Sequence, residues 1–199
     1  MAPAPLAYDA PTVSNPYERH RLRKLAALAA GESICDVGCA QFPNRFLRGR
    51  HVVGLDLAEM DVLPPYTEHI RGDIRQAPEL LAGRTFDTIL LGELIEHVER
   101  PYDLLRTLRE HLAPEGRLIL STPNPLAPPL VIVESLRLRR FFYTPKHTFS
   151  FPPRWVWRML ERTGYSVLRT VGCGLWLFGA WLPAPACLSY QVIYVAGRR

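Results

Sequence analysis

The stretch that decides the fold lies between residues 33 and 57 and reads SICDVGCAQFPN at 33–44 and HVVGLDL at 51–57. The first apolar run ends in Asp36 and Gly38, and the second ends in Asp56. Short continuous apolar runs predict buried strands of a parallel sheet, whose ligands bind beyond the carboxyl ends of the strands. The turn after the first run is therefore the candidate site.

Outward from this stretch, strands alternate with helical segments. The spacing of apolar residues predicts helices at 15–30, 101–112 and 153–163, and further apolar runs predict strands at 68–73, 86–92, 117–121, 165–171 and 189–196. This alternation predicts an α/β fold with a single doubly wound, mostly parallel seven-stranded sheet and helices on both faces. The last two strands are joined without a convincing helix, which indicates an antiparallel C-terminal hairpin at the sheet edge.

The chain of 199 residues has the composition of a soluble globular protein, with 48% hydrophobic and 22% charged residues. Its four cysteines form neither a zinc-type nor a small-domain disulfide pattern. The first residues lack a charged start followed by an apolar stretch, so no secretory signal is expected. The longest apolar run, 174–188, is short for a bilayer crossing and contains two prolines. These features indicate a reduced, cytoplasmic setting.

The turn after the first strand lacks the glycines of a dinucleotide fingerprint. Gly38 is present, but Ala40 and Phe42 stand where small residues let the backbone approach a pyrophosphate, and Pro43 removes a donor. Asp56 lies about twenty residues past the turn, the usual spacing for a carboxylate that accepts both ribose hydroxyls. Together these features predict a nucleoside cofactor that has no pyrophosphate.

Six segments, in order, resemble the motifs of class I (Rossmann-like) S-adenosylmethionine-dependent methyltransferases. They lie at residues 34–39, 53–57, 72–74, 86–97, 112–124 and 147–165, so the resemblance, with the spacing between the motifs, covers nearly the whole chain. The chain is similar to the ubiquinone-pathway O-methyltransferase and type 11–type 23 methyltransferase group. Ala40 and Phe42 depart from the glycines of that group, so weakened cofactor binding, or a non-catalytic relative, is an alternative.

The resemblance implies S-adenosylmethionine as the cofactor and S-adenosylhomocysteine as its product. Asp56 would bind the ribose hydroxyls, and Asp73 would bind the adenine amino group. An arginine of the first helix, Arg19 or Arg21, would reach the methionine carboxylate. The implied cofactor-binding residues are Asp36, Gly38, Cys39, Asp56, Leu57, Asp73, Ile74, Gly92 and Glu93.

Two carboxylates and two imidazoles are expected to converge where the methyl group would sit, from Glu93, Glu96, His97 and the later residue His147. Such a set can hold a divalent cation. It resembles the Glu-x-x-Glu-His and distant His of small-RNA 3′-end 2′-O-methyltransferases, and also the ubiquinone-pathway enzymes that use magnesium. The same Glu-His pair is widespread in the class without a metal. In that case His97 or His147 is the candidate general base for a hydroxyl nucleophile.

One domain is expected over residues 1–199, with a basic helical segment at 1–30. Substrate-side loops or lids are expected at 125–152 and 173–188. The first of these has apolar residues beside the basic stretch 136–142. Such a segment can contact a membrane, cover a hydrophobic substrate, or simply pack as core beneath a long loop.

The sequence therefore predicts a methyltransferase that acts on a small molecule, at a hydroxyl of a quinone-like, lipid-linked, sugar or secondary-metabolite substrate. The alternatives are an RNA 2′-O-methyltransferase with a Glu/His metal site and a non-catalytic cofactor-binding relative. A net charge of +5 suits RNA or simply a solvated basic surface. No attached RNA-binding module or clear basic-aromatic platform is found, which argues against a nucleic acid partner.

Overall fold

The computed structural model describes residues 16–136, 148–177 and 180–199. Its centre is a seven-stranded sheet with the order β3-β2-β1-β4-β5-β9-β6. The pairs β1–β2, β1–β4, β2–β3 and β4–β5 are parallel, and β9 runs antiparallel to both β5 and β6. The strands are β1 (Ser33–Val37), β2 (His51–Asp56), β3 (Tyr66–Arg71), β4 (Phe86–Gly92), β5 (Leu112–Pro123), β6 (Tyr165–Gly172) and β9 (Gln191–Arg198). The predicted sheet and its C-terminal antiparallel pair are confirmed.

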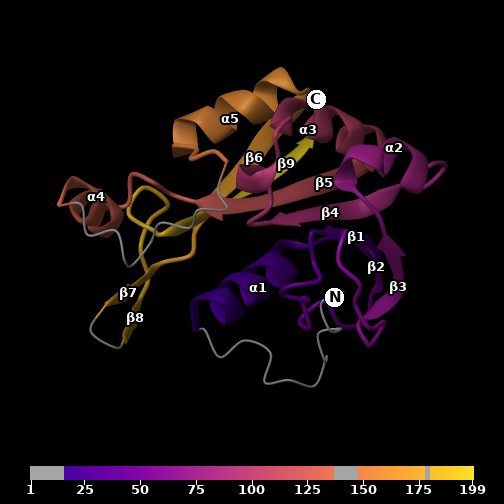
Figure 1. Cartoon of the computed structure of the whole chain (residues 1–199), viewed down its shortest axis with the longest axis horizontal. Coiled ribbons are helices and arrows are strands. Elements are labelled where there is room, and N and C mark those ends of the chain that lie inside the picture. The colour runs from indigo at the N-terminus through magenta and orange to yellow at the C-terminus, as the bar shows by residue number, and fades with distance from the viewer. Residues whose placement is uncertain (1–15, 137–147, 178–179) are drawn as a thin grey trace.

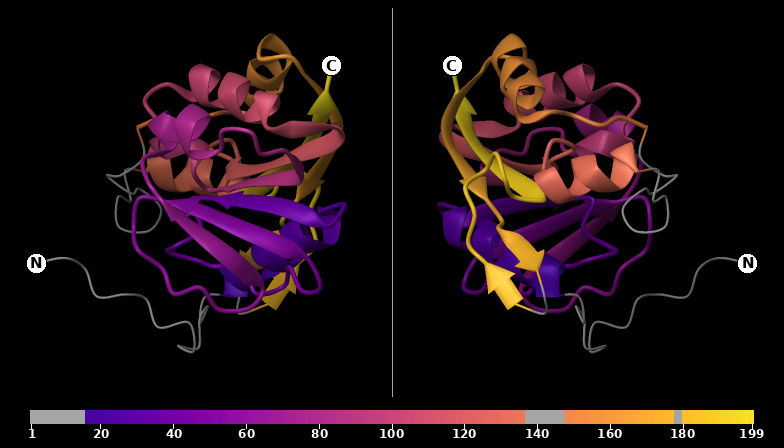
Figure 2. Two further views of the ribbon diagram at one scale, coloured as in Figure 1. Left: turned by 90° about the vertical axis from the view of Figure 1, so that its right-hand side faces the viewer. Right: turned by 90° about the vertical axis from the view of Figure 1, so that its left-hand side faces the viewer.

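Helices cover both faces of the sheet, as predicted (Figures 1 and 2). One face carries α1 (Pro16–Leu28), and the other carries α2 (Ala77–Leu80), α3 (Pro101–Glu110) and α5 (Pro153–Arg162). Leu22 and Leu25 of α1 join the core of the first face, while Leu105 of α3 and Leu160 of α5 join the core of the second. Burying both faces in this way removes the continuous apolar strands from water.

The connection between β1 and β2 has an unusual form. Residues 38–50, all of which the structure describes, contain turns and no helix, although parallel neighbours are usually joined by one. Phe42, Phe46 and Leu47 from this connection pack with the α1 core instead. The first helix therefore covers this part of the sheet together with a loop.

Two elements lie beyond the carboxyl end of β5. The helix α4 (Pro128–Ser135) follows β5, and the short antiparallel pair β7 (Leu175–Leu177) and β8 (Ala180–Leu182) separates β6 from β9 (Figure 1). The sequence predicted a loop, not a strand pair, at 173–188. Strand β5 also begins at Leu112, five residues before the predicted 117, because Leu112 pairs with Phe86.

The remaining parts of the predicted segments lie outside the described residues. These are residues 1–15 of the N-terminal segment, residues 137–147, which contain most of the basic stretch and His147, and residues 178–179 of the segment 173–188. Within the described residues, no helix combines the length and the apolar character that a bilayer crossing requires.

Candidate active site

The turn after β1 depends on glycine at its first position. Gly38 has φ of +76°, and its N–H donates to the carbonyl of Leu55 at 2.8 Å. A Cβ on Gly38 would lie 3.0 Å from the side chain of Leu94. Both the backbone conformation and this close approach require glycine. Cys39, the next residue, is buried with its Sγ 4.0 Å from Sδ of Met60.

Asp56, at the end of β2, stabilises this turn through hydrogen bonds. Its Oδ2 accepts the N–H of Ala40 at 2.8 Å, and its Oδ1 accepts the N–H of Ala58 at 2.9 Å. The following residue, Leu57, has a side chain that is 68% exposed. Neither Asp56 nor Leu57 lines the two cavities described next. Their contacts with a cofactor therefore stay predictions.

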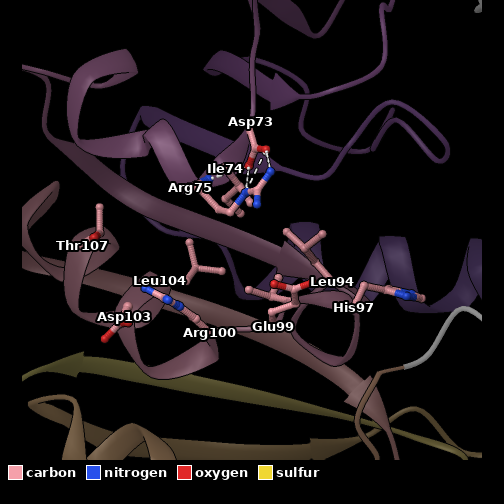
Figure 3. A pocket seen from close by; sticks show the side chains of 11 residues that line it. Asp73, Ile74, Arg75, Leu94, His97, Glu99, Arg100, Asp103, Leu104 and Thr107 are labelled. Atoms are coloured by element: carbon pink, nitrogen blue, oxygen red, sulfur yellow. Dashed lines mark hydrogen bonds and ion pairs between the residues drawn. The ribbon is translucent and has the colours of Figure 1, made fainter.

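The first cavity, of about 690 Å³, contains the two residues assigned to adenine. Asp73 and Ile74 lie on one wall, with Leu94 and His97 opposite them (Figure 3). Hydrogen bonds from the side chain and backbone N–H of Arg75 hold the pKa of Asp73 low, at about 2. An ionised Asp73 can accept the hydrogens of an amino group, and the apolar side chain of Ile74 can pack on a ring.

The second cavity, of about 390 Å³, brings together segments that are far apart in the sequence. The cavity is lined by α1, by the turn after β1 and by the turn after β4. Its lining residues are Glu18, Arg21, Leu22, Leu25, Asp36, Gly38, Cys39, Gln41, Phe42, Asn44, Gly92, Glu93 and His97. Because His97 lines both cavities, the two hollows meet at that side chain.

Arg21 supplies a buried positive charge to the second cavity. Its side chain is 2% exposed, and it donates to Oε2 of Glu18 and, at 3.2 Å, to Oγ of Ser121. Burial lowers the pKa of Arg21, but Glu93 and Glu18 act in the opposite direction and the net shift is upward. Of the two candidate arginines, Arg21 enters the site, whereas Arg19 is exposed to solvent.

Glu93 is held in a strained conformation at the end of β4. Its backbone φ is +55°, a value that residues other than glycine rarely adopt. Its N–H donates to the carbonyl of Ser121 at 3.0 Å, and its Oε2 accepts from Nε2 of Gln191 at 3.2 Å. Burial raises the pKa of Glu93, and the nearby charge of Arg21 opposes that shift. The carboxyl group therefore faces the cavity beside two groups of α1 that act in opposite directions, Arg21, which lowers its pKa, and Glu18, which raises it.

Glu96 is a second buried carboxyl group, 1% exposed. Burial, and then the neighbouring Glu93, raise its pKa to about 8. Its Oε2 accepts a 3.4 Å hydrogen bond from Thr122, and its Oε1 has no partner among the described residues. Its backbone carbonyl accepts the N–H groups of Thr148 and Phe149 at 2.9 and 3.0 Å. The later loop is thus docked onto the segment that carries His97.

The predicted convergence of His147 with the two carboxylates falls outside the described residues. Thr148, the next residue in the chain, is the one that binds the Glu96 carbonyl. Among the residues that the structure describes, no group of three or more His, Cys, Asp and Glu is placed to hold a metal ion. A metal site that includes His147 therefore stays a prediction.

Three polar residues of this region were not singled out from the sequence. Gln191 donates a 3.2 Å hydrogen bond to Glu18, although the two residues are 173 positions apart in the sequence. Tyr66 donates a hydrogen bond to Asp36, which is 30 positions away. Glu18 could have been noticed from its i,i+3 spacing to Arg21. Gln191 could have been noticed less easily, because its only sequence signal is that it is a polar residue at the start of an apolar strand.

Comparison with known proteins gives a consistent result. Residues 13–170 match a family model described as "Methyltransferase domain". The chain is 32% identical over 140 residues to the mitochondrial ubiquinone biosynthesis O-methyltransferase of Schizosaccharomyces pombe, covering 61% of this chain and 49% of that protein. It is 33% identical over 135 residues to the ubiquinone biosynthesis O-methyltransferase of Xanthomonas euvesicatoria, covering 61% and 56%. The chain spans about half the length of these relatives.

Solved structures share the fold at lower identity. A possible histamine N-methyltransferase from Thermotoga maritima superposes with a TM-score of 0.67 at 15% identity, covering 92% of this chain and 89% of that one. A magnesium protoporphyrin IX methyltransferase from Synechocystis with bound SAH superposes with a TM-score of 0.58 at 19% sequence identity, covering 92% of this chain and 84% of that one. Since the family model matches well over half of the chain, the protein belongs to the methyltransferase domain family, within its class I, S-adenosylmethionine-dependent group.

Proposed function

We propose that this protein transfers the methyl group of S-adenosylmethionine to a hydroxyl oxygen of a small molecule. The observation that carries the proposal is the second cavity, where the Gly38 turn, the Gly92–Glu93 turn and the buried Arg21 meet. A quinone-like or lipid-linked hydroxyl compound is the first choice of substrate, and a sugar or secondary metabolite is the next. Relatives named ubiquinone biosynthesis O-methyltransferase support this order.

The residues around the two cavities fit the parts of the cofactor. Gly38 and Gly92 pack so closely that a Cβ would collide with Leu94 or Arg21, and the bare backbone of both glycines borders the second cavity. Arg21 is proposed to bind the methionine carboxylate and Asp36 its amino group, with Cys39 and Glu93 beside them. The proposed ribose and adenine contacts are Asp56, Leu57, Asp73 and Ile74. When bound, S-adenosylmethionine supplies an electrophilic methyl group on a sulfonium ion.

The protein's own chemical task is to orient the acceptor and remove its proton. His97 is exposed and lines both cavities, so it is one candidate for the general base. His147 precedes Thr148, whose N–H binds the Glu96 carbonyl, and it is the other. An imidazole titrates in the range that this role requires. Alignment of the hydroxyl oxygen with the methyl carbon would supply most of the remaining rate enhancement.

The segments 125–152 and 173–188 are proposed to form the substrate side. Exposed apolar side chains gather around α4, namely Leu126, Val131, Ile132 and Leu136, which are 58%, 42%, 57% and 64% exposed. Basic residues follow directly in the sequence at 137–140. An apolar helix beside a basic stretch suits contact with an anionic lipid surface. Peripheral membrane contact would bring the site to a lipid-linked acceptor.

Two further parts of the proposal concern metal and location. Glu93, Glu96, His97 and His147 are proposed as the residues to examine for a divalent cation, which would be compatible with both the ubiquinone-pathway resemblance and the RNA 2′-O-methyltransferase alternative. Loss of turnover in excess chelator, restored by magnesium, would support a metal. The cysteines Cys35, Cys39, Cys173 and Cys187 are all free, which supports a reducing cytoplasmic setting.

The direct test is calorimetric titration with S-adenosylmethionine and S-adenosylhomocysteine, followed by turnover with hydroxylated quinols, sugars and a structured RNA. We expect micromolar binding of both nucleosides and methyl transfer to a quinol hydroxyl. Methylation of RNA, with binding that weakens steeply as salt rises, would favour the RNA alternative. Absence of nucleoside binding under every condition would contradict the proposed function.

A further inference from the structure

The turn that carries Gly38 is fixed without the help of a following helix. Residues 38–50 contain turns only, so no helix N-terminus stands behind the cofactor turn. Side-chain contacts must supply the order that a helix would otherwise give. The contacts of Asn44, Tyr66 and Asp36 do this, and all three side chains are buried.

Asn44 anchors the far end of the turn. Its Nδ2 donates to the carbonyl of Leu22 on α1 at 3.1 Å, and its Oδ1 accepts the N–H of Phe46 at 3.1 Å. Its backbone N–H donates to the hydroxyl of Tyr66 at 2.8 Å. Asn44 thus connects α1, the turn and the start of β3.

The hydroxyl of Tyr66 continues this chain of contacts to β1. It donates to Oδ2 of Asp36 at 2.6 Å, although β2 lies between β1 and β3 in the sheet. The residue of β2 that pairs with Asp36 is Gly54. A Cβ there would lie 3.3 Å from the Tyr66 ring and 2.9 Å from Sγ of Cys39. Glycine at this position therefore lets the ring cross β2.

The charge state of Asp36 depends on groups from several elements. Burial raises its pKa to about 6, and Asp56 on β2 adds to that shift. The hydrogen bond from Tyr66 and the charge of Arg21 on α1 lower it. The neighbouring thiols of Cys35 and Cys39 have pKa values raised by burial and by Asp36, so they stay neutral. Tyr66 and Arg21 are thus the groups that favour the ionised carboxylate.

We propose that Tyr66 is a positioning residue for the cofactor, whose hydroxyl holds Asp36 and the Asn44 end of the turn ready for the cationic amino group of S-adenosylmethionine. This inference rests on the proposed function of the second cavity, which Asp36 and Asn44 both line. Tyr66 is absent from that lining and acts through Asp36. An ionised carboxylate attracts the ammonium group, while a protonated one does not.

The first test compares Tyr66→Phe with Tyr165→Phe. Tyr165 is an equally buried tyrosine on the other face, and its hydroxyl donates to the carbonyl of Leu105 at 2.9 Å. The dissociation constant for S-adenosylhomocysteine is measured by calorimetry between about pH 5 and pH 8. We expect wild-type affinity to fall below about pH 6 as Asp36 gains a proton. Without the Tyr66 hydroxyl the midpoint should move up by about one unit, so affinity should fall about twofold near pH 7 and about tenfold near pH 5. Tyr165→Phe should keep the wild-type midpoint.

A wild-type midpoint in Tyr66→Phe would overturn the inference. Asp36→Asn gives an independent check, because it removes the titrating group. Its affinity should be weak and nearly constant across the same pH range. A wild-type pH profile in Asp36→Asn would show that Asp36 is not the group that titrates.

A second readout separates this inference from the proposed function. Amide hydrogen exchange in residues 38–46 is measured by mass spectrometry without any cofactor. Tyr66→Phe should raise the exchange rate of this turn about tenfold, whereas Tyr165→Phe should not. If the wild type bound no S-adenosylhomocysteine, the proposed function would fail, and the exchange rates would still decide the role of Tyr66. Unchanged exchange in Tyr66→Phe would refute it.

Discussion

Arg21 of α1 lies directly against Gly92 at the end of β4. A Cβ on residue 92 would lie 2.5 Å from Nη1 of Arg21, far inside the normal contact distance of two such atoms. The first helix and the fourth strand are therefore fitted to each other at the point where the methionine end of the cofactor is proposed to bind. Changes at Gly92 act on the site through the position of Arg21.

Gly92→Ala should weaken cofactor binding while the fold persists. The added methyl group displaces the Arg21 guanidinium, and the loss of one charged contact corresponds to about a tenfold rise in the dissociation constant. Calorimetry with S-adenosylhomocysteine measures the change. Gly197→Ala is the matched control, because the nearest atom to a Cβ at residue 197 would be 3.5 Å away, which is an ordinary van der Waals distance. Equal affinities of the two variants would contradict the prediction.

Asp56→Ala should lose more affinity than any exposed carboxylate of the same region. The substitution removes the acceptor of the Ala40 N–H and the proposed acceptor of the ribose hydroxyls. Loss of one charge-assisted contact with the ribose predicts a rise in the dissociation constant of about 10- to 100-fold. Asp61→Ala, at an exposed position, should bind as the wild type does. A small effect of Asp56→Ala would mean that the ribose lies elsewhere.

His147→Ala should abolish turnover and leave cofactor binding unchanged. Loss of a general base lowers the rate by about 100-fold or more. Single-turnover rates and calorimetry on the same preparation measure the two quantities, with His51→Ala, at the exposed start of β2, as the control. If His97→Ala has the larger effect on rate, the base is the histidine between the two cavities. Lost binding in His147→Ala would indicate a structural role.

Glu96→Gln should stabilise the protein at neutral and alkaline pH. The folded-state pKa of Glu96 is raised from 4.5 to about 8, so the unfolded chain releases its proton first as the pH rises. Wild-type stability due to this group is therefore present below about pH 4.5 and is lost progressively toward pH 8. The amide variant avoids this loss and should gain about 2 kcal/mol near pH 8, with little gain near pH 4. Urea unfolding at the two pH values measures it, and a gain independent of pH would contradict the assignment.

Ile132→Glu should reduce binding to anionic vesicles. The substitution places a charge in the exposed apolar surface around α4 and should lower the fraction that sediments with phosphatidylglycerol vesicles several-fold. Leu168→Glu is the matched control, since Leu168 is 63% exposed on β6. Wild-type protein that ignores the vesicles, or an equal loss in both variants, would exclude the proposed membrane contact.

The sheet was predictable because its strands are buried along their whole length. Residues Ile34–Val37 of β1 are all buried, and such a strand keeps a continuous apolar run that stands out in the sequence. The pair β7–β8 and the early start of β5 gave no such signal. The stretch 112–116 contains Pro114 and Gly116 and resembles a turn, but its pairing with β4 extends the strand. Long-range pairing of this kind overrides local preference.

The candidate site was predictable where it is made of motif residues. Gly38, Asp36, Gly92 and Glu93 line one cavity, as their order along the sheet edge suggested. The polar residues that support them come from elements remote in sequence. Gln191 reaches Glu93 from the last strand, and Tyr66 reaches Asp36 across β2. A single sequence carries no record of such pairs.

The left-handed backbone of Glu93 has a consequence for any attempt to evolve this protein in the laboratory. A non-glycine residue at φ of +55° costs about 1 kcal/mol relative to glycine. A library selected for heat resistance alone would therefore favour Glu93→Gly, and its survivors would have lost the carboxylate that faces Arg21. Selection for stability and selection for activity thus pull in opposite directions at this position.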